Sequence, residues 1–155
     1  PENNRTDYIK RVIGLPGDKI KIINGQIIIN NKRIIKKKID EFIDTDTNEI
    51  YKNNGRRRQY IEYFYNQEIK VLDLIDGTFA DNTNEFIVPD NKFFVMGDNR
   101  DNSQDSRFQT VGFIPADNII GKAQFIFFSL ENSRFLQIWK WPTSIRYDRI
   151  FKKIK

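Results

Sequence analysis

The stretch from residue 19 to residue 35 restricts the possible fold of this chain more than any other. It reads KIKIINGQIIINNKRII, so short β-branched runs are separated only by Asn-Gly at 24–25 and Asn-Asn at 30–31. Asn-Gly is favoured in two-residue hairpin turns, and β-branched runs on both sides of it are typical of paired strands. The preceding LPGD at 15–18 suits a type II turn, since Pro presets φ and Gly supplies a positive φ. The segment therefore predicts a strand, a turn and a hairpin.

Strand-like patterns recur through the rest of the chain, whereas helical periodicity is scarce. Residues 36–60 differ, because they carry KKK and RRR runs, many Asp and Asn residues and few apolar ones, which is typical of exposed loops. We therefore predict a mainly-β domain with little helix. The expected strands are YIEYFY at 60–65, EIKVLDLI at 68–75, EFIVP at 85–89, KFFVMG at 92–97 and a long, buried NIIGKAQFIFFSL at 118–130.

The chain contains neither histidine nor cysteine. This absence removes thiol nucleophiles, thiolate zinc sites and every catalytic triad that uses histidine as its base. The proton acceptor of an enzyme with this composition must therefore be a carboxylate, a tyrosine or a lysine whose pKa is lowered. The 155 residues suffice for one domain with a hydrophobic core. They include no apolar run of about 18 residues, which is the length that predicts a membrane-spanning helix.

Lys10 lies in an alternating segment, YIKRVIG at 8–14, that predicts a strand. On such a strand Lys10 shares one face with Tyr8 and Val12. Two interpretations are open at this point. Lys10 is either a solvated side chain on an edge strand, or a general base in an apolar site, where loss of hydration destabilises the charged form of a lysine. The alternation alone does not decide between them.

Two longer segments resemble one known family. YIKRVIGLPGDKI at 8–20 resembles the lysine-bearing motif of bacterial type I signal peptidases, and VMGDNRDNSQDSRFQTVGFIP at 95–115 resembles their Gly-Asp-Asn-Arg motif. The two occur in the family's order, with a variable insertion between them. The resemblance implies antiparallel sheets of the signal-peptidase type. The expected parts are a catalytic core at about 1–29 and 86–130, an inserted hairpin-rich subdomain at about 30–85 and a basic, Trp-containing tail at 131–155.

The resemblance also implies a serine endopeptidase that removes signal peptides from exported preproteins by Ser-Lys acyl transfer, without a cofactor. Its expected location is the bacterial inner membrane, with the catalytic domain on the periplasmic side. By the same resemblance, Lys10 is the general base and Ser103 orients its amine. Tyr8 and Ile9 line the substrate cleft, where an extended peptide adds as a strand. Four charged residues are expected to brace one another and hold Ser103: Asp98, Arg100, Asp105 and Arg107, with Asp105 paired to Arg107.

Other interpretations of the charged segments are weaker. DNRDNSQDS is rich in oxygen ligands, but Ser106 stands where an EF-hand requires Gly, so we expect no metal site. The KKK and RRR runs come without a nucleic-acid-binding motif and are interpreted as solvated hairpin tips, so we expect no nucleic-acid partner. Trp139 and Trp141 in the tail lie among Lys and Arg. This mixture suits either an ordinary core or contact with a membrane lipid surface, and the resemblance favours the membrane.

The sequence departs from the family at one point that matters for chemistry. The family's N-terminal membrane spans and its Ser-Met motif, which supplies the nucleophile, are not found, and none of the five serines offers an obvious substitute. A general base without a hydroxyl to activate gives no acyl-enzyme. We therefore expect a truncated signal-peptidase catalytic domain that does not cleave signal peptides alone. The alternative is a non-catalytic β domain that binds extended peptides or an anionic membrane surface.

Overall fold

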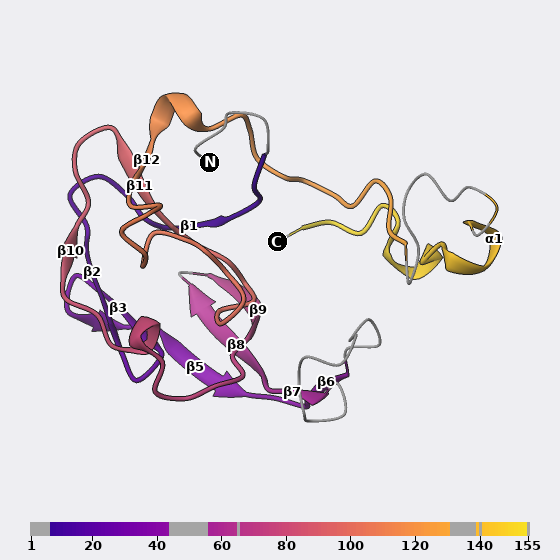
Figure 1. Cartoon of the computed structure of the whole chain (residues 1–155), viewed down its shortest axis with the longest axis horizontal. Helices are drawn as coiled ribbons and strands as arrows, with labels where there is room; N and C mark the ends of the chain where they lie inside the picture. The colour runs from indigo at the N-terminus through magenta and orange to yellow at the C-terminus, as the bar shows by residue number, and fades with distance from the viewer. Residues whose placement is uncertain (1–6, 44–55, 65, 131–138, 140, 155) are drawn as a thin grey trace. The chain divides into compact units, whose positions relative to one another are not determined.

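The structure, a computed structural model, describes residues 7–43, 56–64, 66–130, 139 and 141–154. The chain forms two compact units, and each is described by itself. The first unit comprises Pro1–Phe42 and Arg56–Ile120, and the second comprises Ile43–Gly55 and Gly121–Lys155. Figure 1 labels most strands of the first unit, which contains every residue expected to form the site.

A four-stranded antiparallel sheet carries the predicted hairpin. Its order is β10-β2-β3-β4, and β2 and β3 pair along their whole length across a turn at Asn24 and Gly25, both of which have positive φ. The predicted type II turn is also confirmed, since the Asp18 N–H donates to the Leu15 carbonyl and Gly17 has a φ of 85°. The bounds are β2 Lys19–Ile23, β3 Gln26–Ile29, β4 Lys32–Arg33 and β10 Phe86–Ile87.

A three-stranded sheet of order β1-β11-β12 carries the start of the chain. Its strands are β1 Arg11–Gly14, β11 Lys92–Met96 and β12 Ile114–Pro115. Within the described residues β1 pairs with β11 alone, so β1 is an edge strand, and its register shifts between Val12 and Gly14. The strand begins at Arg11 rather than at Tyr8 as the alternation predicts. Lys10 therefore lies immediately before β1.

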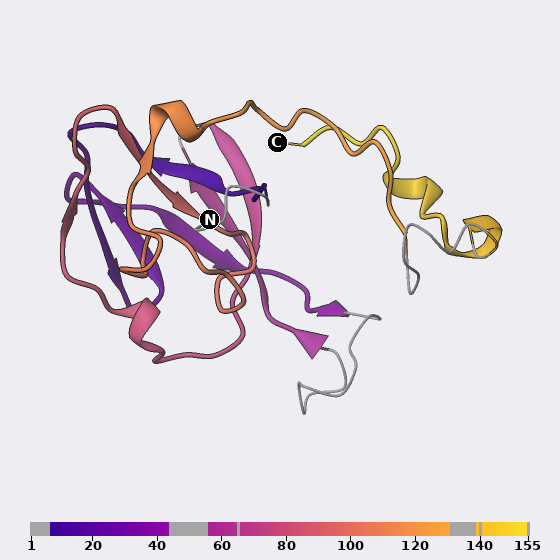
Figure 2. The same cartoon turned by 45° about the horizontal axis from the view of Figure 1, so that its top comes forward.

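A third sheet, of order β5-β8-β9, is built from residues assigned above to the inserted subdomain. β5 spans Ile35–Lys38, β8 spans Gln59–Phe64 and β9 spans Gln67–Leu72. β8 and β9 form a long antiparallel hairpin with six paired residues on each strand. A further short pair joins β6 Phe42–Ile43 to β7 Arg56–Arg57. Figure 2 shows the β8–β9 hairpin beside the other strands of the first unit.

One hydrophobic core joins the three sheets of the first unit. Alternate residues of β2 and β3 point inward because successive side chains of a strand face opposite sides. The hairpin β8–β9 contributes to the same core as the start of the chain. The buried members of this core are Ile13, Ile20, Ile22, Ile27, Ile29, Phe64, Ile69, Val71, Val88, Phe94 and Met96.

The second unit is irregular. Its segments 121–130 and 145–154 run side by side (Figures 1 and 2) and exchange backbone hydrogen bonds, for example between the amide of Ile126 and the carbonyl of Lys152 at 3.0 Å. Its α1, Trp141–Ser144, has four residues. The predicted long buried strand at 118–130 is wrong: isolated bridges replace a strand, and Phe127 is 76% exposed. An apolar strand needs a sheet to bury it, and the described part of this unit forms none.

The prediction of a mainly-β chain with little helix is confirmed. The three larger sheets of the described residues are antiparallel, and the longest described helix is the four-residue α1. The rest of the helical structure consists of three-residue turns of 3-10 type, such as Phe79–Asp81 and Tyr147–Arg149. Among these residues no helix has both the length and the hydropathy that crossing a bilayer requires.

Candidate functional site

Lys10 and Ser103, which are 93 positions apart in the sequence, meet in the first unit. The Lys10 Nζ donates a hydrogen bond to the Ser103 Oγ at 2.7 Å. Ser103 is buried, and Lys10 is half-buried with its amine 5.8 Å from the centre of the Tyr8 ring. Lys10 comes from the residue before β1, and Ser103 from the loop that follows β11. Because β1 pairs with β11, the sheet itself brings the two segments together.

Gly97 makes this approach possible, and the sequence analysis did not single it out. A Cβ atom at Gly97 would lie 2.2 Å from the Ser103 Oγ and 3.5 Å from the Lys10 Nζ. Any other residue here would displace the hydroxyl that contacts the lysine. The sequence did contain an indication of this role. Gly97 stands directly between the apolar strand β11 and the acidic loop, where close backbone approach often requires glycine.

Asp105 and Arg107 lie behind Ser103 and form a buried ion pair. The Arg107 Nε and a terminal nitrogen donate to the two oxygens of Asp105 at 2.8 and 2.9 Å, and Asp105 is 0% exposed. Burial raises the pKa of the Asp105 carboxyl. The hydrogen bond and the charge of Arg107 lower the pKa, and so do the Gly97 amide and the Ser103 hydroxyl. Together they outweigh burial, so the net pKa of Asp105 lies below its ordinary value.

The Ser103 hydroxyl is thus held from both sides. Its oxygen accepts the hydrogen bond of Lys10. The Asp105 carboxylate lies on the other side, close enough for the Ser103 hydroxyl to help to lower the pKa of Asp105.

Asp105 and Arg107 pair as expected, whereas Asp98 and Arg100 have charged partners outside the loop. Asp98 instead pairs with Arg11, whose Nε and a terminal nitrogen donate to its two oxygens, each at 2.8 Å. This hydrogen bond raises the pKa of the Arg11 guanidinium. Arg100 makes a two-point contact with Glu62 of β8, at 2.5 Å for each nitrogen. Neither Arg11 nor Glu62 was predicted from the sequence, because neither belongs to the loop.

Backbone hydrogen bonds fix the path of the loop that follows β11. The carbonyl of Asp98 accepts from the Leu72 amide, and the Arg100 amide donates to the Leu72 carbonyl, each at 2.8 Å. Further along, the Val95 amide donates to the Ser106 Oγ at 2.9 Å, and the Ser106 amide donates to the Val95 carbonyl at 3.0 Å. The loop is therefore tied to the end of β9 on one side and to β11 on the other.

Tyr8 and Ile9 lie next to the lysine and are strongly exposed, at 63% and 81%. Val12 on β1 is exposed as well, so three exposed apolar side chains stand within two residues of Lys10 in the sequence. Within the described residues, β1 has a strand neighbour on one side only. Such an edge can accept an extended peptide as an additional strand.

A cluster of three carboxylates lies elsewhere in the first unit. Oxygens of Asp73, Asp81 and Asp101 come within 4.8 Å of one another. The cluster contains its own cation, because the Lys36 Nζ donates to Asp73 and to the Gly25 carbonyl. A lysine ammonium at this place neutralises part of the charge that would attract a metal ion, so these residues do not fit a metal centre.

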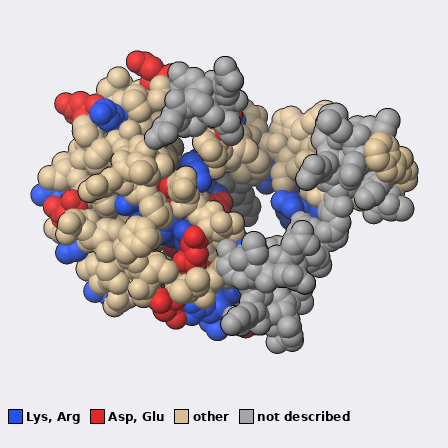
Figure 3. All heavy atoms as spheres, viewed as in Figure 1, with Lys and Arg blue, Asp and Glu red and all other residues tan. Residues whose placement is uncertain are grey.

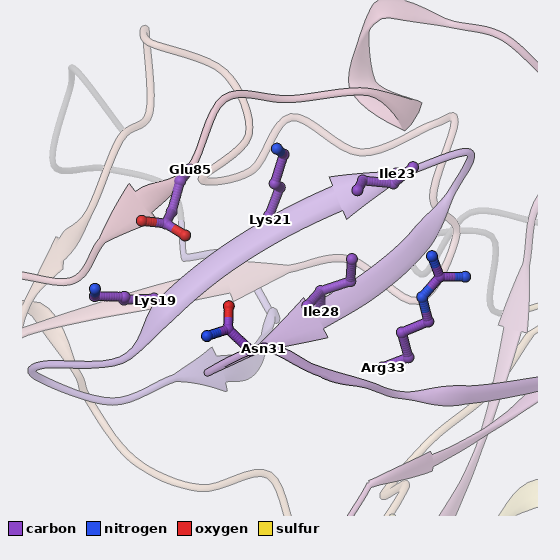
Figure 4. Close-up of a pocket in the computed structure, with 7 residues that line it drawn as sticks. All are labelled: Lys19, Lys21, Ile23, Ile28, Asn31, Arg33 and Glu85. Atoms are coloured by element: carbon purple, nitrogen blue, oxygen red, sulfur yellow. The ribbon is translucent and has the colours of Figure 1, made fainter.

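Two surface hollows contain none of the expected site residues. One, of about 290 Å³, lies on the outer face of β2 and β3, where Lys19, Lys21 and Arg33 surround an apolar floor (Figure 4). The other, of about 300 Å³, belongs to the second unit and is lined by Phe125 and Phe151. Figure 3 shows Lys and Arg interspersed with Asp and Glu over the visible face of the first unit.

The arrangement around Lys10 supports proton transfer. An amine that is held by a hydroxyl, half-buried, and free of ion pairs among the described residues can exchange a proton with a second hydroxyl brought within hydrogen-bond reach. Site and fold together describe a mainly-β protein in which a half-buried lysine amine is hydrogen-bonded to a buried serine hydroxyl.

Comparison with known proteins agrees with this class. The sequence model described as "Signal peptidase, peptidase S26" matches residues 1–128. The chain is 37% identical to signal peptidase I of Rickettsia typhi and to that of Rickettsia prowazekii, over 99% of this chain and 62% of each relative. It thus spans about three-fifths of the length of these curated relatives. A crystal structure of a signal peptidase I from Enterococcus faecalis is 24% identical, with a TM-score of 0.37, over 72% of this chain and 78% of that one.

The chain belongs to the signal peptidase family, peptidase S26.

Proposed function

We propose that this chain is part of the catalytic domain of a serine endopeptidase that removes signal peptides from exported preproteins, with Lys10 as general base and Ser103 as the residue that orients it. The hydrogen bond of 2.7 Å between the Lys10 Nζ and the Ser103 Oγ carries this proposal. Membership of the signal peptidase family supports the same reaction.

In the proposed reaction, the neutral amine of Lys10 takes the proton of a serine hydroxyl as its oxygen attacks the scissile carbonyl. The peptide bond breaks, the leaving amine receives a proton from the Lys10 ammonium, and the acyl group stays on the serine. Lys10 then takes a proton from water as the water oxygen attacks the ester, and it returns this proton to the serine oxygen when the carboxylic acid leaves, which regenerates the enzyme. Ser103 and Asp105 keep the lysine amine aimed at the reacting oxygen throughout.

The nucleophilic serine, in this proposal, lies outside residues 1–155. The Ser103 Oγ accepts the hydrogen bond of Lys10, the Ser106 Oγ accepts one from the Val95 amide, and both serines are buried. Neither hydroxyl is therefore placed to attack a peptide. The relatives are longer than this chain, which covers 62% of the Rickettsia typhi protein. A polypeptide limited to these residues is accordingly expected not to cleave preproteins by itself.

The substrate would bind along the free edge of β1, with Tyr8 and Ile9 as walls of the cleft. When a peptide is added as a strand, the protein contacts its backbone and every second side chain, so signal peptides of varied sequence can bind. Small residues are expected near the cleaved bond. Asp98, Arg100, Asp105 and Arg107 would serve as structural support, each through the contact described above.

The membrane surface is the proposed partner besides the substrate. The second unit exposes aromatic side chains, namely Phe125, Phe127, Trp139, Tyr147 and Phe151, and its basic residues include Arg146, Arg149, Lys152 and Lys153. Aromatic and basic side chains together suit the headgroup region of a bilayer. The proposed location is the bacterial inner membrane, with the catalytic domain on its periplasmic side.

The test compares two proteins. The first is residues 1–155 alone, and the second is the same chain joined to the residues encoded upstream of Pro1. Incubation with a preprotein should give cleavage at the signal-peptide junction with the second protein only, and Lys10→Met should abolish it. Specific, Lys10-dependent cleavage by residues 1–155 alone would show that the nucleophile lies within them.

The competing function is a non-catalytic β domain that binds extended peptides or anionic membranes. It shares the free edge of β1 and the exposed aromatic residues but needs no nucleophile. The gene upstream of Pro1 separates the two functions. An apolar span followed by a Ser-Met motif supports the peptidase, whereas a natural start near Pro1 supports the binding domain.

A further inference from the structure

We propose that Glu62, a residue of the hairpin β8–β9, is a positioning residue for the Lys10–Ser103 pair and acts through Arg100. This inference rests on the proposed function, because it concerns the same site. It gives the inserted hairpin a role in the chemistry, although the hairpin contributes no group to the reaction itself.

The ion pair between Glu62 and Arg100 is almost completely shielded from water. Glu62 is 1% exposed and Arg100 is 4% exposed, and both guanidinium nitrogens that face the carboxylate bind it at 2.5 Å. A two-point contact fixes direction as well as distance. Separating the partners would leave two buried charges unpaired, which is strongly unfavourable. The position of Glu62 therefore determines the position of Arg100.

Arg100 in turn contacts two residues that lie around Ser103, Gly97 and Arg107. Its Nε donates to the Gly97 carbonyl at 3.3 Å, and its own carbonyl accepts a hydrogen bond from Arg107. Gly97 lies directly against the Ser103 side chain, and Arg107 holds Asp105. Arg100 thus joins the backbone on one side of Ser103 to the ion pair on the other.

The hairpin is held in place by the core and by the loop, and it therefore fixes the position of Glu62. Glu62 lies opposite Ile69 across the hairpin, and Ile69 and Phe64 are buried in the core of the first unit. The end of β9 is hydrogen-bonded to the loop through both backbone groups of Leu72. Any change of the hairpin at Glu62 is therefore transmitted to the loop rather than absorbed locally.

The placement of a charge at position 62 also indicates a geometric role. Glu62 shares its face of β8 with Tyr60 and Phe64, both of which pack in or against the core. An apolar residue would fill that face without the cost of removing a carboxylate from water, since buried ion pairs add little to stability over apolar packing. What an apolar residue lacks is the two-point contact that orients Arg100.

The experiment measures both activity and local order in the full protein, with the nucleophile-bearing segment present. Glu62→Gln is isosteric and removes the charge, Glu62→Asp keeps the charge on a shorter arm, and Glu68→Gln is the matched control on the exposed part of the same hairpin. Val71→Ala is a stability control, because it weakens the hairpin core without touching the ion pair. Peptide hydrolysis gives kcat and KM, and hydrogen exchange follows the amides of residues 97–107.

Glu62→Gln should lower kcat about 10- to 100-fold, because displacement of a reacting group by about 1 Å has an effect of that size. KM should stay within about twofold of the wild-type value, since the cleft at β1 is not altered. Exchange at residues 97–107 should accelerate in Glu62→Gln and partly recover in Glu62→Asp. Glu68→Gln should resemble the wild type in all three measurements.

Two results would overturn the proposal: unchanged kcat and unchanged exchange in a folded Glu62→Gln protein, or an equal loss of kcat in Val71→Ala at equal stability. The latter would show that Glu62 only stabilises the fold. If Glu62→Gln does not fold, Glu62→Asp provides the same comparison. Absence of peptidase activity in the wild type would refute the proposed function, whereas the exchange data would still decide whether Glu62 orders the loop.

Discussion

Lys10 and Lys36 both lie in the first unit, but the amine of one binds a neutral group and the amine of the other binds a charged group. The Lys10 Nζ donates to the neutral hydroxyl of Ser103 and forms no ion pair among the described residues. The Lys36 Nζ donates to the Asp73 carboxylate, within a cluster that also contains two further aspartates. Both lysines are only partly accessible to solvent, so burial alone does not distinguish them.

The difference lies in the charge of the partner. A carboxylate stabilises an ammonium ion directly, whereas a hydroxyl accepts its hydrogen bond without contributing a charge. The Asp105 carboxylate, which lies close to Ser103, is already paired with Arg107 rather than with the lysine. This arrangement suits Lys36 for holding structure and Lys10 for exchanging a proton.

Replacement of each lysine by methionine should separate these roles, with the largest expected effect at position 10. Lys10→Met removes the proposed base and should lower kcat by about 10³-fold or more, within the range known for general bases. Lys36→Met should leave kcat nearly unchanged at temperatures where the protein is folded. Peptide hydrolysis at saturating substrate measures both values. A similar loss of kcat in the two folded variants would contradict the assigned roles.

The same two variants should show the reverse order in stability. Lys36→Met leaves the buried Asp73 beside two other carboxylates without its cation, and loss of one partner of a buried pair costs about 3 to 5 kcal/mol. Lys10→Met removes a hydrogen bond to a hydroxyl, worth about 1.5 to 3 kcal/mol at most when one partner is charged. Chemical denaturation followed by circular dichroism gives both free energies of unfolding. A larger loss in Lys10→Met would mean that Lys10 has the greater structural role.

Gly97→Ala should damage the surroundings of Lys10 and leave those of Lys36 intact. The added Cβ would lie 2.2 Å from the Ser103 Oγ, so Ser103 must move away from Lys10. We expect about 1 to 3 kcal/mol of destabilisation from overpacking. A misplaced lysine should also reduce kcat by about 100-fold. Gly121→Ala, where nothing lies within 4 Å of the new atom, is the matched control and should be neutral in both measurements.

The motif residues of this site and the Asp105–Arg107 pair could be predicted from the sequence, but the contacts that reach outside the loop could not. Lys10 and Ser103 stand in two segments that resemble one family, and the structure brings them to 2.7 Å. Glu62 lies in a strand where an acidic residue normally faces water, and no spacing connects it to Arg100. Such a pair depends on how the hairpin packs over the loop, which is a tertiary property that local pattern does not encode.

The one clear error in the fold has a related cause. The run at 118–130 has the apolar density of a buried strand, yet it is exposed at Ile120 and Phe127. Composition describes what a segment could bury but not whether a sheet is present to receive it. The hairpin at 19–29 was predictable because its turn and its pairing partner are both local.

The pH dependence of stability should reveal the ion pair that keeps Asp105 away from Lys10. The pKa of Asp105 is lowered in the folded protein, whereas an aspartate in an unfolded chain has a pKa of about 3.9. The folded state therefore binds this proton less readily than the unfolded state. The stabilisation by Asp105 is complete well above about pH 4 and is lost as the pH falls through the lower, folded-state pKa.

Comparison of the wild type with Asp105→Asn isolates this contribution. Their difference in free energy of unfolding should be largest and constant near neutral pH, where the asparagine leaves Arg107 without its anion, and should narrow progressively below about pH 4. Asp76→Asn is the control: its pKa is also lowered by the hydrogen bond from Arg58, but its side chain is 81% exposed, so water screens the pair. The control should change stability by no more than about 0.5 kcal/mol at any pH. A pH-independent difference for Asp105→Asn would mean that packing, and not the charge balanced by Arg107, supports Ser103 beneath Lys10.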